Sequence, residues 1–321
     1  MKLQPISPLV IEQNEKIVLQ FGSVFNSAGW LKLFGESLKQ YGIFNDDKQL
    51  IGAFHLYQTK LRGLKVFCNA PFTPHIALFA NNPAQTSASV ISFEKSLLSE
   101  LAALIESLPY ALITISLPFK YCDLQPFIWE KFKVIPGYTY RLNLNASEEV
   151  LLANLSSNKR RSLKKMSEEN LRTELTKDFK LVKSLILQTF NRKEKRLNTS
   201  VLDKILFEFA MENNSFAFIT YRNNEAVSAA FCIHDTTTAY YLMGGYDESN
   251  THYAAGVSSI WNCILEAKRR GLNTFDFEGS MIKEVEQYFR DFGGELVPYY
   301  TINKAILPVE ILLKFKRRAY F

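Results

Sequence analysis

The sequence predicts an α/β protein made of two duplicated units, each with helices flanking a mixed sheet. One observation behind this prediction is a faint internal repeat: Ile43–Leu56 and Ile219–Cys232 each hold two short apolar runs around Asn and Asp residues. Apolar runs joined by such turn residues are typical of a β-hairpin. The other observation is that the same order of helices and strands follows both hairpins, as a duplication predicts.

Each half reads as hairpin, helix, strand, helix and strand, with one further strand directly after the second hairpin. A helical pattern precedes each hairpin, over Trp30–Leu38 and Leu202–Phe209. The elements expected after the first hairpin are the helix Val90–Ser107, the strand Ala111–Ser116, the helix Leu124–Phe132 and the strand Tyr138–Leu144. Those expected after the second are the strand Ala239–Gly244, the helix Ala255–Arg270, the strand Thr274–Glu278, the helix Lys283–Phe292 and the strand Tyr299–Lys304. A helix-start signal at Ser147 marks the junction, so we expect domains at 1–145 and 146–321.

Length and composition agree with two soluble domains. The chain has 321 residues, with 47% hydrophobic and 22% charged residues, which excludes disordered, collagen-like and coiled-coil proteins. No apolar run reaches the roughly 18–20 residues of a membrane span, and Glu12 and Glu15 interrupt any signal peptide, so we expect a cytoplasmic protein. The four cysteines form no Cys-x-x-Cys pair, so no metal site is expected.

The net charge of +6 is mild, but the basic residues are clustered. Phosphates, RNA or a phospholipid surface could bind such clusters, and the alternative is that they are solvated helix faces. The clusters are Lys159, Arg160, Arg161, Lys164 and Lys165; Arg192, Lys193, Lys195 and Arg196; and Lys314, Lys316, Arg317 and Arg318. The last lies in a basic amphipathic segment, 308–321, which would either rest on an anionic membrane or pack on the second domain.

Candidate chemistry lies in the second half. In TFDFEGS (Thr274–Ser280), strand alternation places Asp276 and Glu278 on one side and the two phenylalanines on the other. Carboxylates beside buried aromatics are costly unless they are hydrogen-bonded or used, so either could serve as a general base or orient an amine. The alternative is that Asp276 stabilises the following turn and helix start.

A second candidate site lies just upstream, where the sequence predicts a strand, a loop and a helix. We expect Gly244 and Gly245 to let the backbone turn. The free N–H groups of the helix that starts at Ala254–Gly256 could then bind an anion.

Four motifs together resemble the GNAT N-acyltransferase superfamily and, more narrowly, its Fem-type (FemABX) peptidyltransferase branch. They are NKRRSLKKM (158–166), MGGYD (243–247), FDFEGS (275–280) and YFRDFGG (288–294). The resemblance implies two tandem GNAT-like domains, each with a mostly antiparallel mixed sheet flanked by helices. It also implies transfer of an acyl or aminoacyl group from acyl-CoA or aminoacyl-tRNA, as a co-substrate rather than a tightly bound cofactor, to an amine acceptor such as a peptidoglycan precursor.

The resemblance also assigns candidate site residues. The stretch 251–256 corresponds to the superfamily's pyrophosphate turn, with Thr251 and Ala254 in place of its usual Gln or Arg and its first Gly, and with Gly256 kept. Phe289 stands where many GNAT enzymes have a Tyr general acid, so its neighbour Tyr288 is the candidate. Lys159, Arg160, Arg161 and Lys164 would grip precursor or tRNA phosphates. The rival functions are a CoA-dependent small-molecule acetyltransferase and a non-catalytic scaffold that binds RNA or an anionic membrane.

Overall fold

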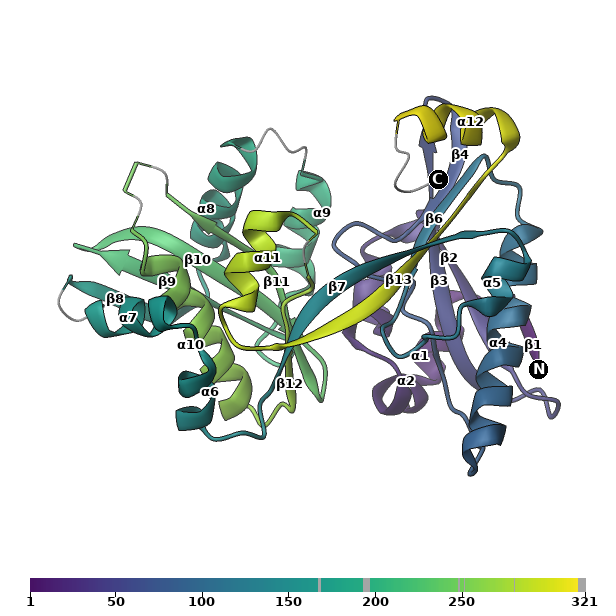
Figure 1. Cartoon of the computed structure of the whole chain (residues 1–321), viewed down its shortest axis with the longest axis horizontal. Helices are drawn as coiled ribbons and strands as arrows, with labels where there is room; N and C mark the ends of the chain where they lie inside the picture. The colour runs from purple at the N-terminus through teal and green to yellow at the C-terminus, as the bar shows by residue number, and fades with distance from the viewer. Residues whose placement is uncertain (167–168, 193–196, 248, 251, 280, 317–321) are drawn as a thin grey trace. The chain divides into compact units, whose positions relative to one another are not determined.

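The computed structural model describes residues 1–321 except 167–168, 193–196, 248, 251, 280 and 317–321, and side chains are not described at 191–192. The chain divides into two compact units, 1–137 with 298–321, and 138–297. The strand order is β1-β2-β3-β4-β6-β13-β7 in the first unit and continues β7-β12-β11-β10-β9-β8 in the second (Figure 1). The predicted α/β class with mixed sheets flanked by helices is confirmed.

The first unit holds a mostly antiparallel sheet, with one parallel pair, β4 and β6. Its strands are β1 (Lys2–Pro5), β2 (Leu38–Phe44), β3 (Leu50–Leu61), β4 (Leu64–Cys68), β5 (Phe79–Ala80), β6 (Leu112–Leu117), the start of β7 (Lys133–Asn143) and most of β13 (Glu295–Ala305). Its helices are α1 (Pro8–Gln13), α2 (Glu15–Phe21), α3 (Ala28–Lys32), α4 (Ser87–Glu106), α5 (Gln125–Trp129) and α12 (Leu307–Lys316), with 3₁₀ turns at Val24–Asn26 and Gly35–Ser37.

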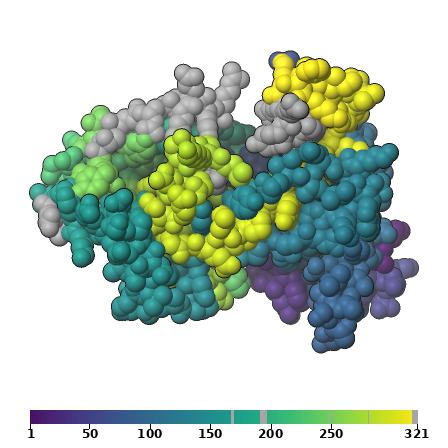
Figure 2. Space-filling view, in the orientation of Figure 1, coloured from purple at the N-terminus to yellow at the C-terminus, as the bar shows by residue number. Residues whose placement is uncertain are grey.

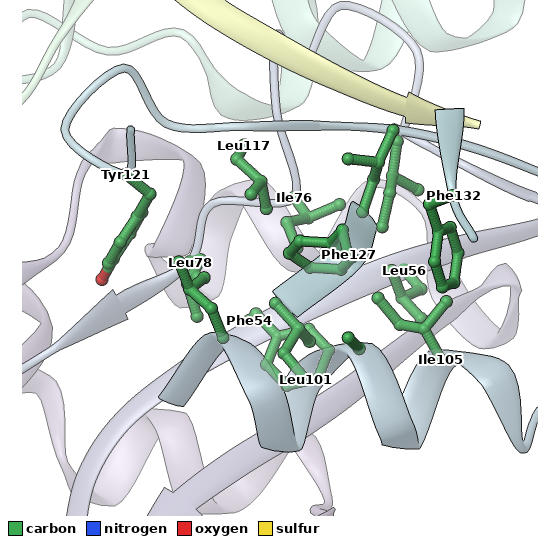
Figure 3. Close-up of a cluster of buried hydrophobic side chains, with 14 of the residues drawn as sticks. Phe54, Leu56, Ile76, Leu78, Leu101, Ile105, Leu117, Tyr121, Phe127 and Phe132 are labelled. Carbon is green, nitrogen blue, oxygen red and sulfur yellow. The ribbon is translucent and has the colours of Figure 1, made fainter. Parts of the chain in front are cut away.

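The core of the first unit lies between α4 and the sheet (Figure 3). Leu101 and Ile105, one turn apart on α4, face Phe54 and Leu56 of β3, and all four side chains are buried. Thr86 caps α4 by accepting a hydrogen bond from the Ser89 N–H, which explains why the helix begins at Ser87.

The second unit repeats this plan, with its own parallel pair, β11 and β12. Its strands are the end of β7, β8 (Leu171–Thr176), β9 (Ser215–Arg222), β10 (Glu225–His234), β11 (Thr238–Tyr246), β12 (Thr274–Asp276) and the start of β13. Its helices are α6 (Glu148–Asn154), α7 (Ser157–Lys165), α8 (Phe179–Arg192), α9 (Thr199–Lys204) with a π-helical turn at Ile205–Phe209, α10 (Ala255–Arg269) and α11 (Lys283–Arg290). Helix α10 packs on β9 and β10, and α8 packs on β10 and β11.

Both hairpins predicted from the internal repeat form. Strands β2 and β3 pair with Ile43 opposite Gly52, and β9 and β10 pair with Ile219 opposite Ala229. Each hairpin turn contains a residue with a positive φ, Lys48 in the first and Asn223 in the second. Asparagine tolerates this backbone geometry better than most residues, which explains Asn223 but not Lys48.

The last strand of each half joins the sheet of the other half's unit. Strand β7, which ends the first half, pairs with β12, and β13, which ends the second half, pairs with β6. The compact units therefore differ from the expected division at residue 145: the second unit begins at Tyr138, and 298–321 belong to the first. Helix α12 accordingly belongs to the first unit, and none of its described residues is buried.

Candidate active site

The parallel pair β11–β12 is short, and it ends where the two candidate carboxylates lie. Only Thr238–Tyr240 pair with Thr274–Asp276, although β11 continues to Tyr246. Beyond Asp276 the backbone of Glu278 and Gly279 turns through the left-handed region, with φ of 58° and 69°. A Cβ on Gly279 would lie 2.3 Å from the Tyr138 carbonyl oxygen, so only glycine fits there. This turn ends β12 and places Glu278 just beyond its last residue.

Asp276 is buried, and three donors surround its carboxylate. The Thr139 hydroxyl donates to Oδ1 over 2.7 Å, and the Glu278 N–H donates to the same oxygen over 2.9 Å. The Arg141 guanidinium forms an ion pair with Oδ2 at 3.1 Å. Burial raises the pKa of Asp276, and the three donors oppose that rise. The hydrogen bonds and the ion pair therefore offset part of the cost of burying the Asp276 charge.

Glu278 has a different environment. Burial raises the pKa of the Glu278 carboxyl well above its usual range, the Asp276 carboxylate raises it further, and Arg141 lowers it. Among the described residues, none donates a hydrogen bond to this carboxylate. Two neighbouring carboxyls with separated pKa values are a common arrangement for acid–base chemistry. The left-handed φ of Glu278 is also costly for a residue with a side chain, which is frequent at functional sites.

Tyr288 is on α11, and its hydroxyl lies near the start of α10. Its hydroxyl is 3.0 Å from the position that a Cβ on Gly256 would take, so the missing side chain of Gly256 makes room for it. Burial raises the pKa of Tyr288, which keeps the hydroxyl protonated and able to donate a proton. The ring packs against Phe289 and Phe292.

The structure brings Asp276 and Glu278 together but does not bring Tyr288 into contact with them. Phe277, between the carboxylates in sequence, packs with Phe289, and Tyr288 packs at the edge of the same cluster. Strand alternation directs Asp276 to the opposite face, toward Thr139 and Arg141. The described contacts therefore form two separate clusters of side chains, one around the carboxylate of Asp276 and one around the ring of Tyr288.

Gly244 and Gly245 do not form the expected turn, because both lie inside β11, opposite Ala230 and Ala229. Packing explains these glycines. A Cβ on Gly245 would lie 2.2 Å from the Leu185 carbonyl oxygen of α8. A Cβ on Gly244 would lie 2.0 Å from the Tyr241 hydroxyl.

The N-terminus of α10 is partly occupied by the protein itself. The Ala254 N–H donates to His252 Nδ1 over 3.1 Å, and the Ala255 N–H donates to the His252 carbonyl over 3.1 Å. His252 Nε2 in turn contacts the Glu169 carboxylate, which fixes the ring. The next N–H groups, of Gly256 and Val257, remain for an anion, since no described residue outside the helix accepts from them. Thr251 lies outside the described residues.

The basic helix α7 does not present its four candidate residues on one surface. Lys159 lies inside the unit, 4% exposed, with Nζ 3.2 Å from the centroid of the Tyr288 ring and 4.6 Å from that of Phe292. Arg160 Nη1 donates to the carbonyls of Ala153 and Leu155, at the end of α6. Arg161 and Lys164 are exposed and could meet phosphates. Lys159 differs because its face of α7 packs against the aromatic residues of α11 and the segment that follows it.

Replacing Lys159 by Met should remove a pH dependence of stability. Burial lowers the Lys159 pKa from 10.5 to about 7, although Asp291 opposes the shift. Between these values the unfolded chain binds a proton that the folded chain lacks. The unfolding free energy of the wild type therefore rises with pH, by at most about 1.4 kcal/mol per unit.

Denaturant unfolding between pH 7 and 9 should show this rise in the wild type and in the control Lys164→Met, whose side chain is exposed. It should be absent in Lys159→Met. Equal slopes for all three proteins would contradict the buried position of Lys159.

Sequence reasoning missed Thr139, Arg141, Tyr240 and His252. The first two come from β7, far from Asp276 in sequence, and no local signal pairs β7 with β12. Tyr240 donates to Asp235, and its pKa is raised by burial and by the charges of Asp235, Glu278 and Asp276. The alternation of Tyr138-Thr139-Tyr140-Arg141 is the one sequence signal that could have found the β7 residues.

The described residues contain neither a metal-binding cluster nor a membrane-spanning helix. Groups of three or more His, Cys, Asp or Glu side chains able to hold a metal ion are not found among them. Within the same part of the chain, no helix combines the length and apolar character needed to cross a membrane.

Comparison with known proteins confirms the resemblance to the GNAT superfamily. Residues 153–290 match the family model described as Acetyltransferase (GNAT) domain. No curated protein matches the chain in sequence.

Solved structures resemble the whole chain. FemX has a TM-score of 0.67 at 12% identity, over 98% of this chain and 99% of its own. The C-terminal domain of a putative lysylphosphatidylglycerol synthetase from Agrobacterium fabrum has a TM-score of 0.60 at 10% identity, over 96% of each chain. A tandem GNAT protein from the clavulanic acid biosynthesis pathway has a TM-score of 0.54 at 11% identity, over 94% of this chain and 97% of its own. These likenesses show a tandem GNAT-like fold.

Proposed function

We propose that this protein transfers an acyl or aminoacyl group from an activated donor to an amine, and that the second unit carries the reaction. The observation that carries the proposal is the pair Asp276 and Glu278 at the end of β12. Glu278 has a raised pKa, whereas three donors hold the Asp276 carboxylate. A carboxyl whose pKa is raised toward the working pH is suited to accept a proton from an amine.

In the proposed reaction the amine nitrogen attacks the carbonyl carbon of the donor. The new C–N bond forms, the ester or thioester bond breaks, and Glu278 takes the proton that the amine loses. The N–H groups of Gly256 and Val257 would polarise an oxygen or bind a phosphate at the start of α10. Tyr288, whose raised pKa keeps it protonated, is the proposed acid for the leaving group.

Aminoacyl-tRNA is the donor that we favour over acyl-CoA. His252 occupies the Ala254 N–H and the Ala255 N–H, so fewer donors remain at α10 for a pyrophosphate. FemX and the lysylphosphatidylglycerol synthetase domain share the fold, and the Fem-type resemblance supports a peptidoglycan precursor as the acceptor. Exposed Arg161 and Lys164 would then contact tRNA or precursor phosphates, and such an enzyme would work in the cytoplasm.

Thermal unfolding with a panel of donors tests this proposal. A donor at about 100 times its dissociation constant should stabilise the folded protein by about 2.7 kcal/mol. We expect this shift with aminoacyl-tRNA, reduced by high salt and by Arg161→Gln with Lys164→Gln. A shift with acetyl-CoA alone would instead indicate a CoA-dependent acetyltransferase. If neither donor changes the unfolding temperature while the protein still binds RNA or vesicles, the result would indicate a non-catalytic scaffold.

A further inference from the structure

Helix α12 exposes an apolar stripe on the first unit. Leu307, Ile311 and Phe315 recur every four residues and are 69%, 49% and 86% exposed. Leu312, beside them on the helix, is 50% exposed. At about 100° per residue these four side chains share one face. The helix forms a ridge on the surface, as Figure 2 shows in yellow.

The tip of the β3–β4 hairpin also exposes apolar side chains, here together with basic ones. Lys60, Leu61, Arg62 and Leu64 are exposed, and the two leucines are 59% and 45% exposed. The tip reads Lys60-Leu61-Arg62-Gly63-Leu64-Lys65, so its two exposed leucines lie among basic residues.

Hydrogen bonds place these two elements at the same end of the first sheet. The Ala111 N–H donates to the Lys65 carbonyl over 2.8 Å, and the Ile306 N–H donates to the Ala111 carbonyl over 3.1 Å. Two strand spacings, about 10 Å, therefore separate the base of the hairpin tip from the start of α12. Figure 1 shows α12 beside β4, whose start follows the hairpin tip.

The charge of this end is positive. Lys314 and Lys316 flank the stripe of α12, and Lys60 and Arg62 flank the leucines of the hairpin tip. Glu310 is the acidic residue of these two segments, and its carboxylate is paired with Lys314 at 2.6 Å. A second copy of the chain seated here would bring like charges together, whereas an anionic bilayer offers both the opposite charge and an apolar interior.

We infer that α12 and the hairpin tip form one surface, the α12–hairpin surface, that rests on an anionic phospholipid bilayer. It consists of Lys60, Leu61, Arg62, Leu64, Leu307, Ile311, Leu312, Lys314, Phe315 and Lys316. The apolar side chains enter the boundary of the headgroups, and the lysines and Arg62 contact lipid phosphates. This surface belongs to the first unit and does not depend on the reaction proposed for the second.

Vesicle binding of the full chain tests the inference. We expect co-sedimentation with vesicles of phosphatidylcholine and phosphatidylglycerol, and much weaker binding to phosphatidylcholine alone. The double variant Ile311→Gln, Phe315→Gln should lower the partition coefficient at least about tenfold. Lys60→Gln with Arg62→Gln should reduce binding to anionic vesicles and weaken its salt dependence.

Matched controls come from the same unit. Ile91→Gln and Ile128→Gln remove side chains that are 56% and 55% exposed outside this surface, and should leave binding unchanged. Equal binding of the wild type to anionic and to neutral vesicles would overturn the inference. So would variants of the stripe that bind anionic vesicles as well as the wild type does. So would a dimer in lipid-free solution that the stripe variants abolish, because it would assign the stripe to a second copy.

Discussion

Glu278→Gln is expected to lower the rate of transfer by roughly 10²- to 10⁴-fold, the usual contribution of a general acid or base. The amide keeps the shape of the side chain but cannot take the proton of the amine. Because burial and Asp276 raise the pKa of Glu278, wild-type activity should increase with pH through that raised pKa. In a transfer assay with the donor identified by binding, the activity of the variant should not increase with pH in this range.

Measurements of the unfolding free energy distinguish a loss of catalysis in Glu278→Gln from a loss of folded protein. In the folded protein Glu278 keeps its proton at pH values where an unfolded glutamate has lost it, so the wild type loses stability as pH rises from about 4.5 to the raised pKa. Glu278→Gln removes that loss and should be at least as stable as the wild type at neutral pH. Glu284→Gln, an exposed glutamate of α11, is the control for activity. Unchanged turnover in Glu278→Gln would remove Glu278 from the mechanism.

Gly245→Ala is expected to destabilise the protein by about 1–3 kcal/mol or more. The added Cβ would lie 2.2 Å from the carbonyl oxygen of Leu185 and 2.5 Å from the nitrogen of Ile186. Both atoms belong to the backbone of α8, so relief requires the helix to move away from β11. Urea unfolding of both proteins measures the difference.

Gly256→Ala is the matched control. The nearest atoms to its Cβ are the Tyr288 hydroxyl at 3.0 Å and the Ser228 hydroxyl at 3.8 Å, both at the ends of side chains. Since alanine also favours a helix over glycine, this variant should stay within about 1 kcal/mol of the wild type. A Gly245→Ala protein as stable as the control would show that close packing of α8 on β11 does not require glycine there.

Local patterns in the sequence predicted most elements that carry the site. The strand Thr274–Glu278 was expected two residues longer than β12, because the left-handed backbone of Glu278 ends the pairing early. The helix expected at Ala255–Arg270 corresponds to α10, Ala255–Arg269. Strands β4 and β8 were not predicted, since their short polar and apolar alternation lacks a distinctive turn signal.

The amino-acid sequence by itself determined both hairpins, the order of elements after them and the presence of two carboxylates at the end of β12. These features depend on near neighbours, whose side-chain periodicity and turn chemistry are local. Only the tertiary structure decided that Thr139 and Arg141 hold Asp276, that Lys159 lies beneath Tyr288, and that β7 and β13 each join the other half's unit. Such partners are set by the pairing of distant strands and by helix packing, which the residues on either side do not encode.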